Sequence, residues 1–244
     1  MKFVLAAIIL SSLYAGPRNS VELLNKMHER YAGKWYKTFT FNQTTERYKN
    51  DSLVNKTTWY EALQLPDNFR IDFGDIKEGN AVIFHRDSMY SFRKGQLGRV
   101  TVNNDDLTFL LGGMYFYQMD EVLKTITKYG YDLGKFHEDR WKNEKVLVIG
   151  ADSSGQKTNQ LWIDEDKLVL LRFIKYEDGH KEEGIFEDHK KFGGGWSETK
   201  CTFYFDDKLG QVEYYHNCRA NEPIDPKVFD PASFGKIHWL KGSK

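Results

Sequence analysis

The side chains of this sequence that could hold a metal ion or move a proton are its histidines, cysteines and acidic residues. The 7 histidines show neither the HExxH nor the HxH spacing that presents two ligands to one ion. The nearest approach is His180 with Glu182 and Glu183, in a stretch with the composition of a charged turn. There is also no Gly-x-Ser-x-Gly motif, phosphate-binding loop or dinucleotide fingerprint. We therefore expect no catalytic residue, no metal and no cofactor.

One catalytic alternative stays open, because the chain contains 35 Asp and Glu residues. Two carboxyl groups facing each other across a cleft can carry out acid–base chemistry of the glycosidase kind. The sequence does not select a pair. Such an enzyme would show convergent polar side chains with perturbed pKa values in a cleft.

The 2 cysteines, Cys201 and Cys218, lie in a stretch with the pattern of a hairpin. A two-residue turn directly after Lys208 would set them opposite each other, with their Cβ atoms in bridging range. The same register places Asp206 opposite Glu213, which is mildly unfavourable. We predict a disulfide worth on the order of 3 kcal/mol. The alternative is two free thiols, one of them buried as a small hydrophobic group.

The N-terminus has the three parts of a secretory signal peptide. Lys2 supplies the positive charge, Phe3 to Leu10 forms an apolar run, and Ala15 is a small residue suited to cleavage. We predict that residues 1–16 are removed and that the exported chain begins near Pro17, without a lipid anchor. The alternative is a buried first helix of the mature protein. No later segment is apolar for about 20 residues, so no transmembrane helix is expected.

Charge and composition narrow the possible partners. Lys plus Arg and Asp plus Glu are both 35, so no basic excess favours nucleic acid. The aromatic share of 15% favours half-buried sheet and an aromatic-lined cavity. We expect a monomer.

Hydrophobic periodicity predicts three helices and about eleven strands in one α+β domain, mainly antiparallel β, spanning residues 17–244. Helices are expected at 20–31, 103–111 and 120–129. The second and third are candidate lids over the sheet. Strands are expected at 35–43, 55–63, 68–73, 81–85, 88–92, 145–149, 160–164, 168–176, 180–188, 198–206 and 212–217. The tail from 223 to 239 reads as loop with one helical turn.

Two family patterns bear on this outline. Gly33-Lys34-Trp35, at the start of the first strand, is the Gly-x-Trp mark of lipocalins, although the chain is much longer than a single lipocalin barrel. Three longer stretches, Met27-His-Glu-Arg-Tyr-Ala-Gly33, Phe39-Thr-Phe-Asn-Gln43 and Pro66-Asp-Asn-Phe-Arg-Ile-Asp72, resemble the LolA/LolB-like superfamily of bacterial outer-membrane lipoprotein carriers. The resemblance is strongest to the outer-membrane lipoprotein-sorting proteins of that superfamily.

The resemblance implies an unclosed, strongly curved β-barrel of about eleven strands, with helices covering its concave face. It also implies a periplasmic location and carriage of lipids or acylated proteins. The chain departs from the family at two points. Leu65 stands where carriers commonly have an Arg before the Pro, and Arg86-Asp87-Ser88 replaces an Asp-Gly turn.

We therefore predict a non-catalytic carrier or binding protein for an apolar ligand, with a possible transient protein partner at the membrane. Alternation along the strands selects the residues expected to line the half-barrel: Trp35, Phe39, Phe41, Trp59, Phe69, Ile71, Phe73, Val82, Phe84, Phe203 and Phe205. Taken singly, residues of this kind are more often plain core than ligand wall. A sensor or scaffold module of the same fold is the alternative, and it predicts an exposed aromatic patch near Trp196 or His238-Trp239.

Overall fold

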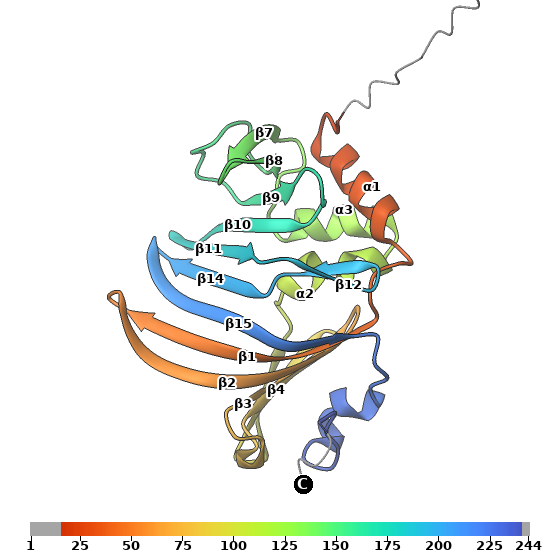
Figure 1. The fold of residues 1–244 in the computed structure, drawn as a ribbon, viewed down its shortest axis with the longest axis vertical. Coiled ribbons are helices and arrows are strands. Elements are labelled where there is room, and N and C mark those ends of the chain that lie inside the picture. The colour runs from red at the N-terminus through yellow and green to blue at the C-terminus, as the bar shows by residue number, and fades with distance from the viewer. Residues whose placement is uncertain (1–15, 241–244) are drawn as a thin grey trace, which may run out of the picture.

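The computed structural model describes residues 16–240 of the 244, so the predicted signal peptide lies outside the described residues except for Gly16. Its main element is one antiparallel sheet of 13 strands in the order β6-β5-β4-β3-β2-β1-β15-β14-β11-β10-β9-β8-β7. Figure 1 shows this sheet curving around the helices without closing. The first and last strands of the curved sheet are β6 and β7, so it keeps two free edges.

Eleven of the sheet's 12 strand pairings join strands that are next to each other in the chain or one hairpin apart, and the exception is β1 with β15. The strands are β1 (Thr38–Lys49), β2 (Ser52–Gln64), β3 (Asn68–Phe73), β4 (Ala81–His85), β5 (Ser88–Arg93), β6 (Gln96–Val102), β7 (Phe136–Trp141), β8 (Glu144–Ile149), β9 (Gln160–Asp164), β10 (Leu170–Glu177), β11 (His180–Glu187), β14 (Lys200–Phe205) and β15 (Lys208–Ala220). The short strands β12 (Lys190–Phe192) and β13 (Gly195–Ser197) form a separate hairpin.

The long strands β1 and β2 set the curvature and the inward face. Their hairpin turns at Asn50-Asp51, where both residues have a left-handed backbone, as the tight two-residue turn requires. Phe39 and Phe41 alternate with half-buried residues along β1. Their partners on β2 are Leu63 and Glu61, so these side chains share the concave face.

Three α-helices cover the concave face: α1 (Ser20–Tyr31), α2 (Leu107–Leu110) and α3 (Met119–Lys128). The first begins after Asn19, whose side chain accepts a hydrogen bond from the N–H of Glu22. Leu23 and Leu24 of α1, Val122 and Ile126 of α3 and the strands β8 to β10 contribute to one buried cluster. The helices therefore fill the part of the half-barrel that lies against β8–β10.

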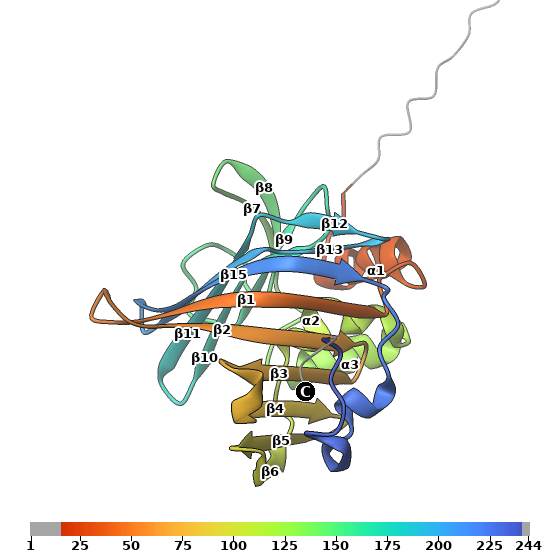
Figure 2. The same cartoon turned by 60° about the horizontal axis from the view of Figure 1, so that its bottom comes forward.

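The C-terminal segment covers the convex face of β3 and β4, as Figure 2 shows. It contains two 3₁₀ turns, η3 (Pro226–Phe229) and η4 (Pro231–Ser233). Buried Arg70 of β3 forms a bidentate pair with Asp72 at 2.7 and 2.9 Å and donates to the carbonyl of Val228 at 3.1 Å. Its guanidinium also lies 4.8 Å from the ring centroid of Phe234. Arg70 thus ties the tail to the sheet.

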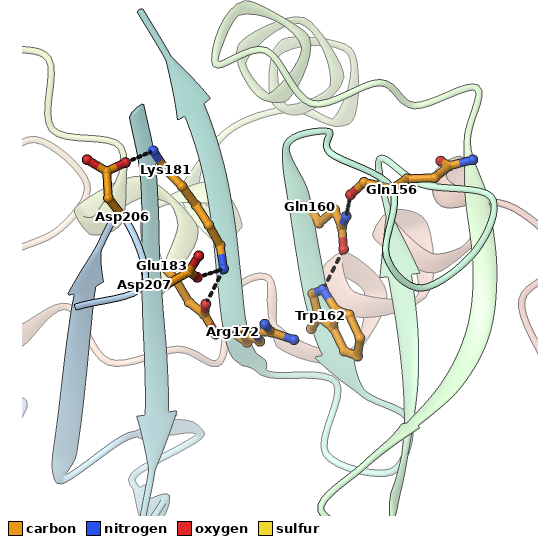
Figure 3. A network of polar contacts seen from close by, with 8 residues as sticks. All are labelled: Gln156, Gln160, Trp162, Arg172, Lys181, Glu183, Asp206 and Asp207. Atoms are coloured by element: carbon orange, nitrogen blue, oxygen red, sulfur yellow. Dashed lines mark hydrogen bonds and ion pairs between the residues drawn. The ribbon is translucent and has the colours of Figure 1, made fainter. Parts of the chain in front are cut away.

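A second polar network joins β10, β11 and the β14–β15 turn, and Figure 3 shows its members. Glu183 accepts from Arg172 at 2.7 Å and pairs with Lys181 at 2.9 Å. Lys181 also reaches Asp207 of the turn at 2.6 Å. The Arg172 guanidinium lies 4.8 Å from the Trp162 ring centroid, which extends the network to β9.

The predicted fold class is confirmed: an open, curved antiparallel sheet with three helices against it. The main sheet has 13 strands rather than eleven, because β6 and β7 at its edges were not predicted. The predicted first strand began too early: Trp35 precedes β1 and packs against Tyr31 and Tyr115. Among the described residues, no helix is long and apolar enough to cross a membrane.

The predicted disulfide is wrong in this structure, where Cys201 and Cys218 are both free. The hairpin turns at Asp206-Asp207, both with a left-handed backbone, and not after Lys208. This register pairs Cys201 with Glu213, so Cys218 lies five residues further along β15. The thiol of Cys201 instead donates to the hydroxyl of Tyr215 at 3.3 Å.

Candidate ligand-binding site

A cavity of about 190 Å³ lies on the concave face, between α2 and the sheet. Its walls come from β1, β2, β3, β11, β14 and β15, which are neighbours on one side of the half-barrel. A dry apolar cavity of about 150 Å³ is large enough to bind benzene, so this space can take a ring or a short hydrocarbon segment. The apolar wall consists of Tyr36, Phe39, Phe41, Trp59, Leu63, Leu65, Phe69, Ile71, Leu107, Leu111, Phe186, Phe203 and Tyr215.

Aromatic rings form a continuous surface along the floor of the cavity. Phe41 of β1 stacks on Tyr215 of β15 with the ring centroids 4.2 Å apart. Phe39 lies 5.5 Å from Phe41 and 4.8 Å from Tyr36 by the same measure. Such pairs are stabilising beyond the area they bury, by about 0.5–1.5 kcal/mol each. The floor is therefore a rigid apolar surface.

The roof is α2, a helix of 4 residues that carries Leu107 and is followed by Leu111. Its first N–H groups are capped by Asp105, whose carboxylate accepts from the N–H of Leu107 at 3.1 Å and of Thr108 at 3.3 Å. The hydroxyl of Thr108 also donates to Asp105. The single helical turn of α2, capped by Asp105, thus lies between the cavity and the space above it.

That space is a wider polar groove of about 1060 Å³, lined by β3 and β4 on one side and by α3 and β10 on the other. Phe69, Asp105 and Thr108 line both the groove and the cavity. The groove therefore adjoins the apolar cavity at the α2 capping turn.

Three buried glutamates interrupt the apolar wall: Glu61 of β2, Glu213 of β15, and Glu198 between β13 and β14. Burial raises the pKa of Glu198 and of Glu213 to about 7. The pKa of Glu61 is also raised well above its usual range, by burial and then by repulsion from Glu213, Glu198 and Asp105. The wall of the cavity is therefore mainly apolar and carries these three carboxyl groups.

The three carboxyl groups differ in their hydrogen bonds. Glu213 accepts from the amide of Gln211 at 2.5 Å and from the hydroxyl of Tyr215 at 3.3 Å. Glu61 is 4% exposed, and no described residue donates a hydrogen bond to it or forms an ion pair with it. The carboxylate oxygens of Glu61 are not among the fully buried polar atoms that lack a partner, so they are accessible from the cavity and have capacity for a donor there.

The structure brings six of the eleven predicted lining residues to this cavity: Phe39, Phe41, Trp59, Phe69, Ile71 and Phe203. Phe84 lines the polar groove. Phe73 packs edge-on against Trp59, and Val82 is paired with Ile71 on the same face, but neither lines the cavity. Trp35 lies in the helix-packed core. Phe205 is 49% exposed on the hairpin tip, beyond a register shift after Phe203.

Sequence reasoning missed the polar members of the wall. Glu61 lies between Trp59 and Leu63 at the same parity, so strict alternation would have turned it inward. Gln43 follows Phe39 and Phe41 in the same way. Glu198 had no such signal, because it lies in the link between two sheets.

The comparisons with known proteins support the fold. No protein-family model and no curated protein matches the chain. Among solved structures, an outer membrane lipoprotein-sorting protein domain from Vibrio parahaemolyticus superposes with a TM-score of 0.61 at 10% identity, covering 88% of this chain and 97% of its own.

Two further crystal structures are similar over most of their length. A DUF1329 family protein from Desulfovibrio piger gives a TM-score of 0.59 at 14% identity, covering 88% of this chain and 97% of its own. A LolA superfamily protein from Nitrosomonas europaea gives a TM-score of 0.55 at 12% identity, covering 87% of this chain and 98% of its own. The chain therefore has the LolA-like fold, and the sequence resemblance is confirmed at the level of the fold.

Proposed function

We propose that this protein is a non-catalytic carrier or binding protein that holds a lipid, an acylated protein or another apolar ligand in the cavity beneath α2. The observation that carries the proposal is the aromatic-walled cavity itself. Helices pack against β8–β10, whereas the inner face of β1–β3, β14 and β15 keeps an unfilled space. Each CH₂ group moved from water into such a space contributes about 0.8 kcal/mol.

The surroundings of the cavity suit reversible uptake. A cavity of about 190 Å³ is small for a long chain, so a longer ligand requires α2 to move outward or extends into the adjoining groove. The roof is held by one capping residue, Asp105, and by the packing of Leu107 and Leu111. When no ligand is bound, this roof keeps the aromatic floor from water, which limits aggregation.

The proposal extends to the whole chain and its location. We place residues 17–244 in one periplasmic domain, since the 13-stranded sheet is continuous over the described residues. One cooperative unfolding transition is the expected result. N-terminal sequencing of the exported protein should begin at Gly16 or Pro17, and retention of Met1 would contradict the export prediction.

The scaffold alternative predicts aromatic residues free to bind a partner near Trp196 or His238-Trp239. Trp196 packs against the main core, and Trp239 packs against the small cluster around Val228. These side chains are half-buried rather than exposed, so this alternative has less support at the residues it named.

The enzyme alternative predicts convergent carboxyl groups with perturbed pKa values, and Glu61, Glu198 and Glu213 match that description. An acid–base pair, however, needs two groups whose surroundings shift their pKa values apart. Here burial shifts all three pKa values upward. We therefore assign the cluster to ligand binding.

A cavity-filling substitution tests the proposal. Leu63 lies in the wall opposite Phe39 and Phe69, and Leu63→Trp should occupy part of the space. We expect a loss of at least tenfold in affinity for the neutral fluorescent probe N-phenyl-1-naphthylamine. Leu53→Trp is the matched control, because Leu53 is 52% exposed on the β1–β2 hairpin. Equal binding by both variants would place the ligand elsewhere.

A further inference from the structure

We propose that the cavity is selective for amphipathic ligands whose buried end is a primary ammonium group, recognised by the carboxyl groups of Glu61, Glu198 and Glu213. This inference rests on the proposed function and names the chemical class of the ligand. Two observations carry it together: an apolar, aromatic-walled cavity and a carboxyl group in its wall to which no residue of the described range 16–240 donates a hydrogen bond.

Glu61 gives the clearest indication. Its side chain lines the cavity, and it is shielded from solvent by the sheet and by α2. The charged groups that act on it, Glu213 of β15, Glu198 and Asp105, are all acidic. A hydrocarbon entering the cavity would leave this carboxyl group buried without a partner, which disfavours a purely apolar ligand.

Other head groups fit less well. A fatty-acid carboxylate would bring a further negative charge to an acidic cluster, and like charges at short range disfavour ionisation. A hydroxyl group supplies one donor and no charge. An ammonium group supplies three donors and a positive charge, which satisfies Glu61 and relieves the repulsion among the carboxylates.

The aromatic floor adds to this selectivity. Phe41 and Tyr215 are stacked in the same wall as the glutamates. Trp59 is also part of this wall and already receives a cation on one side, with the Arg47 guanidinium 5.6 Å from its ring. Ring faces attract desolvated cations, so the walls around the carboxyl groups favour the same ligand.

The selectivity should depend on pH, because the carboxyl groups bind a cation only when they are ionised. The titratable groups facing the cluster are Glu61 on β2, Glu213 and Tyr215 on β15, Cys201 on β14, Glu198 before it, Asp105 at the roof and Tyr36 before β1. The tyrosines and the thiol stay neutral near pH 7, since burial raises their pKa values further. Glu198 and Glu213 gain charge as the pH rises through about 7.

The experiment is a calorimetric titration of the full chain with four ligands of one chain length: n-octylamine, n-octanol, octanoate and octyltrimethylammonium. At pH 8 we expect octylamine to bind about tenfold or more tightly than each of the other three. The difference in affinity between octylamine and the other ligands should become smaller at pH 5.5 and in the Glu61→Gln/Glu213→Gln double variant. Glu144→Gln, which removes a charge at an exposed position on β8, is the control for a general charge effect and should keep the advantage of octylamine.

The outcomes separate the two proposals. Equal binding of octylamine and octanol, or an advantage that survives in the double variant, overturns the amine selectivity and leaves the apolar carrier intact. An advantage lost equally in Glu144→Gln also overturns it, because a general effect of net charge would then be responsible. If none of the four ligands binds, and N-phenyl-1-naphthylamine does not bind either, the carrier proposal itself fails.

Discussion

At the scale of residues, the glutamates of the cavity make the fold sensitive to pH in an unusual direction. Burial raises the folded-state pKa of Glu198 and Glu213 to about 7, above the value of about 4.5 in the unfolded chain. A group with a raised folded-state pKa contributes its full stability below the unfolded-state pKa and loses it as the pH rises through the folded-state pKa. Stability should therefore fall between pH 5 and pH 8.

Glu213→Gln should remove most of the pH dependence that Glu213 contributes to the stability of the fold. At pH 8 we expect the variant to have a free energy of unfolding higher than the original by up to about 3 kcal/mol, and by less than about 1 kcal/mol at pH 5. Burial lowers the pKa of His189 to about 4, so this residue makes stability rise with pH below pH 6.5. Its contribution is the same in both proteins and therefore cancels when the variant is compared with the original.

Urea denaturation at the two pH values measures the difference directly. Glu144→Gln should show no change with pH relative to the original protein, because it removes a charge from an exposed site. A Glu213→Gln variant less stable than the original at pH 8 would contradict the assignment of Glu213 as a buried, costly carboxylate.

At the scale of elements, the packing of the C-terminal segment on the sheet depends on the buried guanidinium group of Arg70. Arg70 on β3 pairs with Asp72 and donates to the carbonyl groups of Val228 and Ile237. Arg70→Leu removes the bidentate partner of buried Asp72 and leaves it only His238, at 3.6 Å, and we expect a loss of about 3–5 kcal/mol of stability.

The double variant Arg70→Leu/Asp72→Leu should recover much of this loss, because it removes both buried charges together. Urea denaturation of both variants checks the prediction, with Arg93→Leu at an exposed position of β5 as control. If the single and the double variant lost the same stability, the interaction of Arg70 with the tail carbonyls would be responsible, and not the uncompensated charge.

The same scale shows what could be predicted from the sequence. The boundaries of α1, β3, β4 and β9 agree with the prediction to the residue. In α1, β3 and β4 the buried positions recur with the period of the element, whereas β9 is buried at every position. The strands β6 and β7 were missed because they lie at the sheet edges. An edge strand has one hydrogen-bonded neighbour and little buried surface, and β6 has five exposed residues in succession.

The candidate site was predictable in its apolar part only. Alternation identified Phe39, Phe41 and Trp59, whose side chains do lie in the cavity wall. The glutamates were not identified, because acidic residues are rarely buried and the inward parity of Glu61 on β2 was therefore not followed. The error in the cysteine pairing had a local cause: an Asp206-Asp207 turn sets a different register from a turn after Lys208.

At the scale of the whole molecule, the inner face of the curved sheet forms both the main core and the wall of the cavity. Against β8–β10 that face is covered by α1 and α3 and forms the main core. Beneath α2 it keeps a cavity that adjoins an open polar groove. The two regions are continuous, because Phe39, Phe41 and Phe203 of the cavity wall belong to the same buried cluster as the helix-covered core.

The central claim is that this cavity holds an apolar ligand. Native mass spectrometry of the full chain, purified from a bacterial host, tests it most directly when spectra are recorded before and after organic extraction. We predict an added mass of defined size that disappears on extraction and returns when the ligand is added back. A single bare mass before extraction, with no uptake of N-phenyl-1-naphthylamine or octylamine afterwards, would contradict the claim.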